Sequence, residues 1–402
     1  MPQSAHPSAR TQTSDPHTRS QTHHAQTRTE PPSTPAAPRH VHLAVDLSDA
    51  GARPADWRDV GSRAAQPFDL DRLLDLVGTA QRGTLDFVVF DDTFALRPRS
   101  TGASGGRLDA ALVSARLAPR TAGLGLVAAL DPEHTDPVHV AQAVTAVDAA
   151  SAGRAGWQVG TTGSPGAGEP DGSALGGVPT SVLDEAVETV VRHWAAGTGD
   201  VRPEPGRARA VDVDGVPFVV RSPARRASSA VRPVVVLRAD GPAALAVAGR
   251  HADVVRVRAG DRQAAVAHRR EIREAARHEG RTPDEVRVLV DVVAVLGPDR
   301  ASARARLDLL REIDGTGWDT GSLIVAGTPQ DLAALVADWV DAGAADGFVV
   351  RPGSVQTDLV GLVDGVVPLL RAAGRFRRHY PGTTLRHSLG VPEAAPRAPA
   401  TV

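Results

Sequence analysis

The stretch TAGLGLVAALDPEHTDPVHVAQAVTAVDAASAGRAGWQVGTT, residues 121–162, contains two apolar runs separated by a helical pattern. The runs at 122–130 and 154–162 have the length and composition of buried strands. The segment 137–151 between them has helical spacing and opens with Pro137, a residue that suits the first turn of a helix. A buried strand, a helix and a second buried strand predict a βαβ unit, in which the two strands run parallel.

The same alternation continues on both sides of this unit. Six further buried strands are predicted at 40–47, 85–92, 232–239, 253–259, 286–297 and 346–353. Helices are predicted at 69–83, 183–194, 242–252, 262–280, 299–313, 329–343 and 358–374. A hairpin is also predicted at 209–222, where Asp214-Gly215 separates two β-prone runs.

Eight buried strands, nearly all separated by helices, indicate a parallel sheet that is covered on its faces. Eight such units in about 330 residues predict an α/β fold of the (β/α)8 TIM-barrel type with insertions. An open, doubly wound sheet is the alternative. It is less favoured because no glycine fingerprint of the GxGxxG kind follows the first strand.

The two ends of the chain have a different composition from the rest. Residues 1–38 are rich in Ser, Thr, His, Pro, Gln and Arg, and residues 392–402 are rich in Pro and Ala. Segments with so little apolar surface cannot offset the entropy cost of ordering. We therefore expect one barrel domain at 39–391 between two disordered tails.

Bulk properties exclude several kinds of partner. The 402 residues carry a net charge of -2, so no field draws the chain toward nucleic acid or an anionic membrane. No apolar run approaches the length of about 20 residues that spans a bilayer. Cysteine is absent, which excludes disulfides, thiolate metal sites and a cysteine nucleophile. The expected location is cytoplasmic.

In (β/α)8 barrels, ligands lie at the C-terminal ends of the strands. The predicted strand ends offer carboxylates, amides, hydroxyls and arginines, namely Asp91, Asp92, Thr93, Gln158, Thr161, Thr162, Arg238, Asp240, Arg256, Arg258 and Arg351. They contain neither a Ser/His/Asp set nor a His/carboxylate cluster with metal-ligand spacing, so no metal site is predicted. The pattern alone indicates a barrel enzyme of unknown ligand.

Four stretches resemble the bacterial-luciferase-like flavin monooxygenases. Residues 121–162 are similar to the family's segment that joins its third and fourth strands. GTLDFVVFDDTFAL (83–96) resembles its second strand, and AGTPQDLAALVADWVDAGAADGFVV (326–350) resembles its Gly-Thr-Pro helix and Asp-Gly-Phe strand. VVPLLRAAGRFRRHYPGTTLRHSLG (366–390) is similar to the C-terminal signature of the branch with the nitrilotriacetate, EDTA and dibenzothiophene-sulfone monooxygenases.

The resemblance implies a two-component oxygenase. In this family reduced FMN comes from a separate NAD(P)H:flavin reductase, and the bound flavin reacts with O2 to oxygenate a small-molecule substrate. Members commonly form dimers or tetramers, so a homo-oligomer is implied. The C-terminal extension is expected to pack on the barrel or on a partner subunit, with Tyr380 and Leu385 as its apolar anchors.

The family's flavin contacts carry over unevenly. The acid that ends the second strand is Asp92, and the family's threonine in the fourth strand matches Thr161. Ala129 stands where the family has a threonine, and Gln158 stands where it has an asparagine. The tyrosine of an Arg-Tyr motif falls on Thr180.

The loop that receives the FMN phosphate departs furthest. Asp240 and Gly241 replace two serines of that loop. A carboxylate about 4 Å from a phosphate costs roughly 1–4 kcal/mol, or about one to three decades of affinity. Three readings follow: an FMN-dependent monooxygenase with a remodelled site, a relative that uses another cofactor such as a deazaflavin, or a non-catalytic relative.

Overall fold

In the computed structural model, the described residues are 39–47, 69–90, 109–132, 135–160, 180–198, 209–213, 216–220, 232–239, 241–314 and 321–392. All of them belong to the unit Pro38–Val402. The two predicted tails, 1–38 and 392–402, lie outside the described residues except for Pro392 itself.

The predicted βαβ unit is present in the described part of 121–162. It consists of β3 (Gly125–Leu130), α3 (Pro137–Ser151) and β4 (Ala155–Val159), and the two strands are parallel neighbours. The side chain of Asp136 caps α3 by accepting the N–H of Val138 at 2.7 Å. Residue Ala152 ends the helix in the left-handed conformation, which reverses the chain toward β4.

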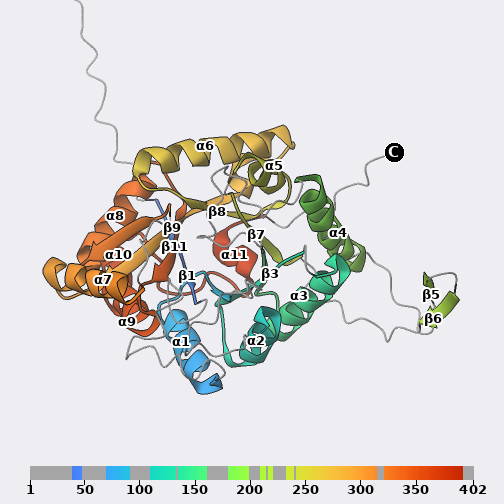
Figure 1. The fold of residues 1–402 in the computed structure, drawn as a ribbon, viewed down its shortest axis with the longest axis horizontal. Helices are drawn as coiled ribbons and strands as arrows, with labels where there is room; N and C mark the ends of the chain where they lie inside the picture. Colours follow the sequence, from blue (N-terminus) through green and yellow to red (C-terminus); the bar gives the residue numbers. More distant parts are fainter. Residues whose placement is uncertain are drawn as a thin grey trace, which may run out of the picture. The chain divides into compact units, whose positions relative to one another are not determined.

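Eight parallel strands close into a ring (Figure 1). The other six strands are β1 (His42–Asp46), β2 (Phe87–Phe90), β7 (Val234–Arg238), β8 (Val254–Arg258), β9 (Arg287–Leu296) and β11 (Gly347–Pro352). They follow the order β1-β2-β3-β4-β7-β8-β9-β11, and β11 pairs with β1 to complete the circle. The prediction of a (β/α)8 barrel is confirmed, and the open-sheet alternative is wrong.

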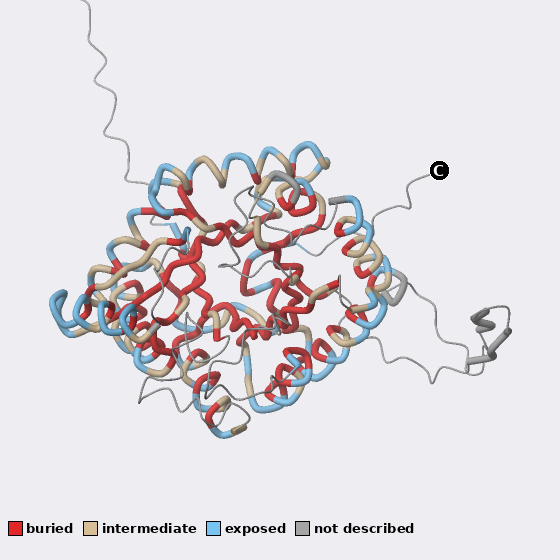
Figure 2. The backbone as a smooth tube through the Cα atoms, viewed as in Figure 1, coloured by how far each residue is buried: buried red, intermediate tan, exposed pale blue. Residues whose placement is uncertain are grey.

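Helices surround the ring. They are α1 (Leu70–Arg82), α2 (Ala110–Leu117), α4 (Thr180–Thr198), α5 (Pro242–His251), α6 (Arg262–His278), α7 (Arg300–Asp314), α8 (Pro329–Asp341), α9 (Val355–Val360) and α10 (Val367–Ala372). A short helix, α11 (Leu385–Leu389), follows them. Buried residues run along the strands and the inner helix faces, while the outer helix faces are exposed (Figure 2).

Some elements differ from the prediction. Helix α2 and strand β10 (Leu323–Gly327) were not predicted, and β10 pairs with the second half of β9. The predicted helix 358–374 is interrupted by a π-helical turn at Gly361–Val366, in which the N–H of Val367 bonds to the carbonyl of Leu362. Pro368 follows directly and has no N–H to donate, so the regular hydrogen-bond ladder is broken there. The predicted hairpin is present as β5 (Arg209–Val213) and β6 (Val216–Val220).

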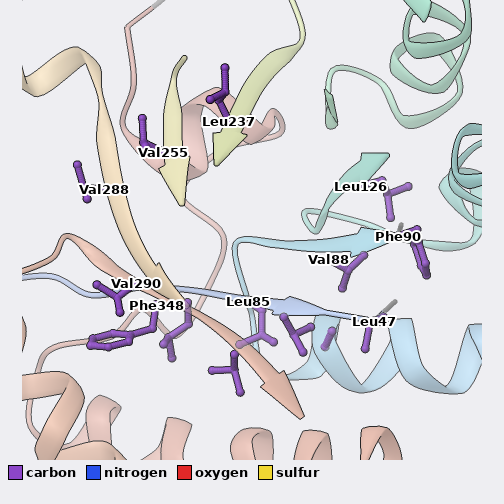
Figure 3. Packing of buried hydrophobic residues seen from close by; sticks show 14 of the residues in the cluster. Leu47, Leu85, Val88, Phe90, Leu126, Leu237, Val255, Val288, Val290 and Phe348 are labelled. Atoms are coloured by element: carbon purple, nitrogen blue, oxygen red, sulfur yellow. The ribbon is translucent and has the colours of Figure 1, made fainter. Parts of the chain in front are cut away.

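Alternating strand residues face opposite sides of the ring. Val88 and Phe90 pack outward against the helices, together with Leu126, Leu237 and Phe348 (Figure 3). Phe87 and Val89 face the lumen instead. The lumen is filled by apolar side chains from seven of the strands, namely Ala44, Phe87, Val89, Val127, Val234, Val236, Val254, Leu289 and Val349.

The C-terminal extension closes one end of this lumen. Leu385 and Leu389 of α11 are fully buried and pack into the lumen cluster, and α11 appears inside the ring in Figure 1. A Cβ added at Gly125 would lie 2.5 Å from Leu385, so glycine is required on that strand for the helix to enter. Of the two predicted docking places, the barrel or a partner subunit, the structure shows the extension on its own barrel, with Leu385 as an anchor.

Tyr380 is the second predicted anchor. Its ring lies against Gly123, where an added Cβ would come within 2.1 Å of the ring. Gly123 has a φ of +72°, so glycine is favoured there on conformational grounds as well. Arg377 lies over the same ring at 5.6 Å, and burial raises the pKa of the Tyr380 hydroxyl.

Three aspartates tie the N-terminal ends of the strands together. Asp86, Asp253 and Asp346 each directly precede a strand, and each accepts an N–H from the neighbouring strand at 2.8–2.9 Å. Each is also bound by arginine. Arg377 and Arg386 of the C-terminal extension bind Asp86 and Asp253 at 2.9 and 2.6 Å. Arg269 of α6 binds Asp346 at 2.6 Å. The extension is therefore held by charge as well as by apolar contact.

Substitution of Arg377 by methionine tests this attachment. The change leaves the fully buried Asp86 without the guanidinium that pairs with it. We expect the free energy of unfolding to fall by about 3–5 kcal/mol. Denaturant-induced unfolding measures the difference. The matched control is Arg82→Met, which removes an ion pair with Asp364 whose side chains are both more than half exposed; it should cost at most about 1 kcal/mol. Equal losses would contradict the assignment.

The same aspartates predict how stability depends on acid. Burial alone would raise the pKa of Asp86, Asp253 and Asp346, but the arginines and backbone N–H groups outweigh it and lower all three. Their stabilisation is therefore complete above about pH 4, the ordinary value, and is lost as the pH falls through the lower folded values.

We expect the free energy of unfolding to fall below about pH 4 by up to ~1.4 kcal/mol per pH unit for each carboxylate. Denaturant titrations at a series of pH values measure this slope. Arg377→Met should make it shallower, and Arg82→Met should not. An unchanged slope in Arg377→Met would show that the arginine does not set the ionisation of Asp86.

Candidate active site

At the C-terminal ends of the strands, the inward-facing positions change from apolar to charged. Ala44, Val236, Val254, Leu289 and Val349 face the lumen, and the residues two positions further on point the same way. We term the layer formed by these residues and the inward positions of β3 and β4 the mouth layer. It consists of Asp46, Ala129, Gln158, Arg238, Arg256, Asp291 and Arg351. Arg258, two residues beyond Arg256 on β8, is the next inward position above it.

Arg256 occupies the centre of the mouth layer and is only 1% exposed. Its Nε and Nη2 donate to the two carboxylate oxygens of Asp291, each at 2.9 Å. Nη2 also donates to Asp46 at 2.9 Å, and Nη1 donates to the amide oxygen of Gln158 at 2.7 Å. One guanidinium thus links β8 to β9, β1 and β4 across the barrel.

These contacts keep Arg256 charged. Burial alone would lower its pKa, but Asp291 and Asp46 outweigh burial and raise it. Both carboxylate oxygens of Asp291 are engaged, and Asp291 is itself fully buried. The floor of the mouth is therefore an ion network built around a charged Arg256.

The mouth layer is electrostatically two-sided. Strands β7, β8 and β11 contribute Arg238, Arg256, Arg258 and Arg351, whereas β2 and β3 contribute the apolar Val89 and Ala129. Burial lowers the pKa of Arg351, and the charges of Arg238 and Arg256 lower it further. The charges of Asp46 and Asp291 raise this pKa, but they do not outweigh the lowering. Among the described residues, arginines therefore lie on one side of the mouth, and Val89 and Ala129 lie on the other.

The predicted flavin contacts fall into two groups. Ala129 and Gln158 lie directly opposite each other on β3 and β4, and both are buried. Ala129 has no hydroxyl to offer, and the amide oxygen of Gln158 is held by Arg256. Asp92, Thr161 and Asp240 lie outside the described residues, as does the side chain of Thr180, which begins α4.

Gly241 begins α5 directly beyond β7. Its backbone is extended and Gly241, which has no side chain, gives α5 no side-chain cap of its own, in contrast to Asp136 at the start of α3. Pro242 occupies the first turn, which contains no acidic residue. The first backbone N–H groups of a helix have no intrahelical partner, and with the helix dipole they favour an anion. This end of α5 fits a phosphate.

Trp157 supports β4 from the outside. Its indole N–H donates to the carbonyl of Leu130 at 3.0 Å, and its ring meets that of Trp194 edge-on at 6.0 Å between centroids. It therefore packs in the helix layer and does not face the mouth.

Two members of the central network were absent from the predicted site. Asp46 and Asp291 were not selected, although Arg256 was noted at a strand end. The signal for Asp291 was available, because it is the one charged residue within the apolar run LVDVVAVL (289–296). A carboxylate in a buried strand requires a partner, but the sequence does not identify which of several arginines provides it.

Other kinds of site find no support in the part of the chain that the structure describes. It contains no group of three or more His, Cys, Asp or Glu side chains that could hold a metal ion. Among the described residues, no helix combines the length and apolar composition needed to cross a bilayer.

The fold is that of a (β/α)8-barrel protein, a class in which ligands bind at the C-terminal ends of the strands. A family model described as luciferase-like monooxygenase matches residues 52–320. The chain belongs to this family and is therefore a flavin-dependent monooxygenase by descent.

Several relatives match over nearly their whole length. N-acetyl-S-(2-succino)cysteine monooxygenase from Bacillus subtilis is 24% identical, over 88% of this chain and 97% of that protein. Dibenzothiophene-sulfone monooxygenase from Rhodococcus erythropolis is 26% identical, with the same coverage. The structure of EDTA monooxygenase from Chelativorans sp. BNC1 aligns with a TM-score of 0.71 at 23% identity, over 88% of this chain and 99% of that one. The predicted branch of the family is thereby confirmed.

A double-mutant cycle on Arg256 and Asp291 tests the central network. We expect each of Arg256→Met and Asp291→Asn alone to cost about 3–5 kcal/mol, because each leaves a buried, unpaired partner. The double variant should cost much less than the sum, and urea unfolding measures the coupling.

The control cycle uses Arg262 and Asp338, an ion pair at 2.8 Å in which both side chains are more than half exposed. Its coupling should be about 0.2–1 kcal/mol. Additive losses for Arg256 and Asp291 would contradict the network.

Proposed function

We propose that this protein is an FMN-dependent monooxygenase that takes reduced FMN from a separate NAD(P)H:flavin reductase. It uses O2 to oxygenate a small organic substrate at the barrel mouth. The observation that carries the proposal is the start of α5 at Gly241, where the resemblance implies the family's phosphate loop and where the first N–H groups of the helix favour an anion.

We assign the remainder of the cofactor to residues of the mouth. Val89 and Ala129 form an apolar wall suited to one face of a flat ring system. Because Arg256 holds the amide oxygen of Gln158, the amide nitrogen of Gln158 is left to donate to a ligand carbonyl. Bound reduced flavin would supply the electrons that activate O2. The chain's own part is to hold the ring and to exclude water.

The ion network sets how deeply the ring can enter. Arg256, Asp291 and Asp46 span the barrel at the level of the strand ends, so a ligand must rest on them. This fits the family's chemistry, in which few side chains react covalently. Assembly as a homo-oligomer and a cytoplasmic location remain predictions from the sequence.

A second reading is that the chain no longer binds flavin. Two substitutions favour this reading. Ala129 lacks the family's hydroxyl, and the amide oxygen of Gln158 is bound by Arg256. A deazaflavin cofactor is the third reading. The fold is shared with a coenzyme F420-dependent tetrahydromethanopterin reductase from Methanopyrus kandleri, with a TM-score of 0.56 at 16% identity, which shows the fold alone.

Anaerobic titration of the purified protein with FMN, reduced FMN and F420 separates the three readings. Binding in this titration should be followed through a signal of the flavin rather than of tryptophan, because Trp157 faces the helix layer. We expect reduced FMN to bind at micromolar concentrations, and O2 uptake to require the reductase and NAD(P)H. Binding of F420 alone would favour the deazaflavin reading, and no binding of any of the three would favour a non-catalytic protein.

The variant Asp240→Ser tests the phosphate position. If the carboxylate repels the FMN phosphate, its removal should raise FMN affinity by roughly one to three decades. Asp338→Asn removes an exposed carboxylate of α8 and is the charge-matched control, which should leave affinity unchanged. Equal affinity in Asp240→Ser and the parent protein would refute the repulsion.

A further inference from the structure

A pocket lies at the N-terminal end of the barrel, at the opposite end of the strands from the mouth. It has a volume of about 630 Å³ and is bounded by Thr84, Thr121 and Arg154, which precede β2, β3 and β4. The turn at 378–383 of the C-terminal extension forms its other side. Small-molecule sites typically have volumes of about 300–1,000 Å³. We term this site the basal pocket.

The basal pocket is lined by cations and by no acid. Its charged lining residues are Arg154, Arg378 and His379, and the described residues around it include neither aspartate nor glutamate. Arg154 is only 5% exposed, and its five N–H groups donate to four backbone carbonyl groups and to the hydroxyl of Thr121. None of these partners carries a charge, so the buried guanidinium is not neutralised. Burial accordingly lowers the pKa of Arg154.

Arg378 adds an exposed positive charge at the edge of the basal pocket. Among the described residues, no acid and no hydrogen-bond acceptor pairs with it. Burial lowers the pKa of the neighbouring Arg371, and the charge of Arg378 lowers it further. Residues 365–392 contain no acidic residue at all, so the extension cannot neutralise its own arginines. The pocket therefore favours an anion.

Neutral donors complete the lining. The side-chain oxygen of Gln81 accepts the N–H of Ala122 at 2.8 Å, which leaves the amide nitrogen of Gln81 to donate. The hydroxyl of Tyr380 is buried and has no hydrogen-bond partner among the described residues. Burial raises the pKa of this hydroxyl, so it remains a neutral donor. A buried hydroxyl without a partner is costly, and an acceptor on a ligand would remove that cost.

Unusual backbone conformations occur in the same place. In the described part of the chain, Thr84 and Ala152 are the two non-glycine residues with a positive φ, at 53° and 57°. Both line the basal pocket. A β-branched residue such as threonine rarely adopts this conformation, and strained residues of this kind cluster at ligand sites.

We propose that the basal pocket binds a small organic molecule through a phosphate monoester. Such a group carries about 1.5–2 negative charges near pH 7 and three acceptor oxygens. This matches the two guanidinium charges of Arg154 and Arg378 and the free donors of Gln81 and Tyr380. A carboxylate would bring only one charge and two oxygens. Since loops of the barrel and the extension both line the pocket, the ligand holds the extension against the barrel.

Tyr380 is the only tyrosine of the chain, so it provides a reporter inside the basal pocket. The full-length protein is labelled with meta-fluorotyrosine and titrated with phenyl phosphate at constant ionic strength. We expect the single fluorine resonance to shift in a saturable way and Tm to rise, as it does for a ligand of the folded state. Benzoate should bind at least about tenfold more weakly, and benzyl alcohol should cause no shift.

Variants assign the binding to these side chains. Arg378→Met should weaken phenyl phosphate by about tenfold or more, because it removes a charge-assisted hydrogen bond. Arg262→Met is the control, since Arg262 is an exposed arginine of α6, and its affinity should equal that of the parent protein. Tyr380→Phe, followed by calorimetry, should weaken binding without lowering the Tm of the free protein, because the hydroxyl has no partner to lose.

Inorganic phosphate and FMN are the competing sources of a phosphate group. Phenyl phosphate that binds more tightly than inorganic phosphate supports an organic ligand, whereas equal affinities would assign the pocket to the free ion and overturn the organic part. Competition between FMN and phenyl phosphate for the fluorine shift would overturn a site that is separate from the flavin.

Two outcomes overturn the proposal as a whole. In the first, phenyl phosphate shifts the fluorine resonance no more than benzyl alcohol does. In the second, Arg262→Met loses as much affinity as Arg378→Met.

Discussion

The ion pair between Arg256 and Asp291 is the interaction on which the mouth of this barrel depends. It joins β8 to β9, and through Asp46 and Gln158 the same guanidinium reaches β1 and β4. Few arrangements allow a charge to be buried to 1% exposure, because desolvation must be offset by several well-directed hydrogen bonds at once. Arg256 therefore connects four of the eight strands at their C-terminal ends.

The two ends of the barrel use the same chemistry for different purposes. At the N-terminal end, Asp86 and Asp253 bind arginines of the C-terminal extension, and α11 fills the lumen with Leu385 and Leu389. That end is closed by the protein's own C-terminal extension. At the C-terminal end, the arginines come from the strands themselves, and nothing comparable to α11 covers them among the described residues. In barrels of this kind ligands bind at the C-terminal end.

Most of the fold could be predicted because it depends on local patterns. The runs at 122–130 and 154–162 are long, apolar and separated by a well-capped helix, and each of the eight predicted strands lies in the ring. Strand β10 was missed because it is short and only half-buried, so its pattern is weak. The π-helical turn at 361–366 was missed because it depends on how Pro368 redirects hydrogen bonds, which apolar spacing does not reveal.

The site was less predictable because its contacts join residues that are distant in sequence. Gln158 and Arg256 are separated by 98 positions, and Asp46 and Arg256 by 210. Alternation along each strand does place these side chains in the lumen. It does not determine which of four arginines reaches across, since that depends on the stagger of the strands and on side-chain length.

Side-chain length also explains the departure at Gln158. The family resemblance places asparagine at this position, and a glutamine is longer by one methylene, or about 1.5 Å. The amide oxygen of Gln158 meets Arg256 at 2.7 Å, so an asparagine on the same backbone would fall short of the guanidinium. Gln158 and Arg256 therefore act as a matched pair, in which the longer amide joins the ion network. Ala129 lies opposite Gln158 on β3. The two departures from the resemblance, Ala129 and Gln158, thus lie side by side, and Gln158 belongs to the network around a buried arginine.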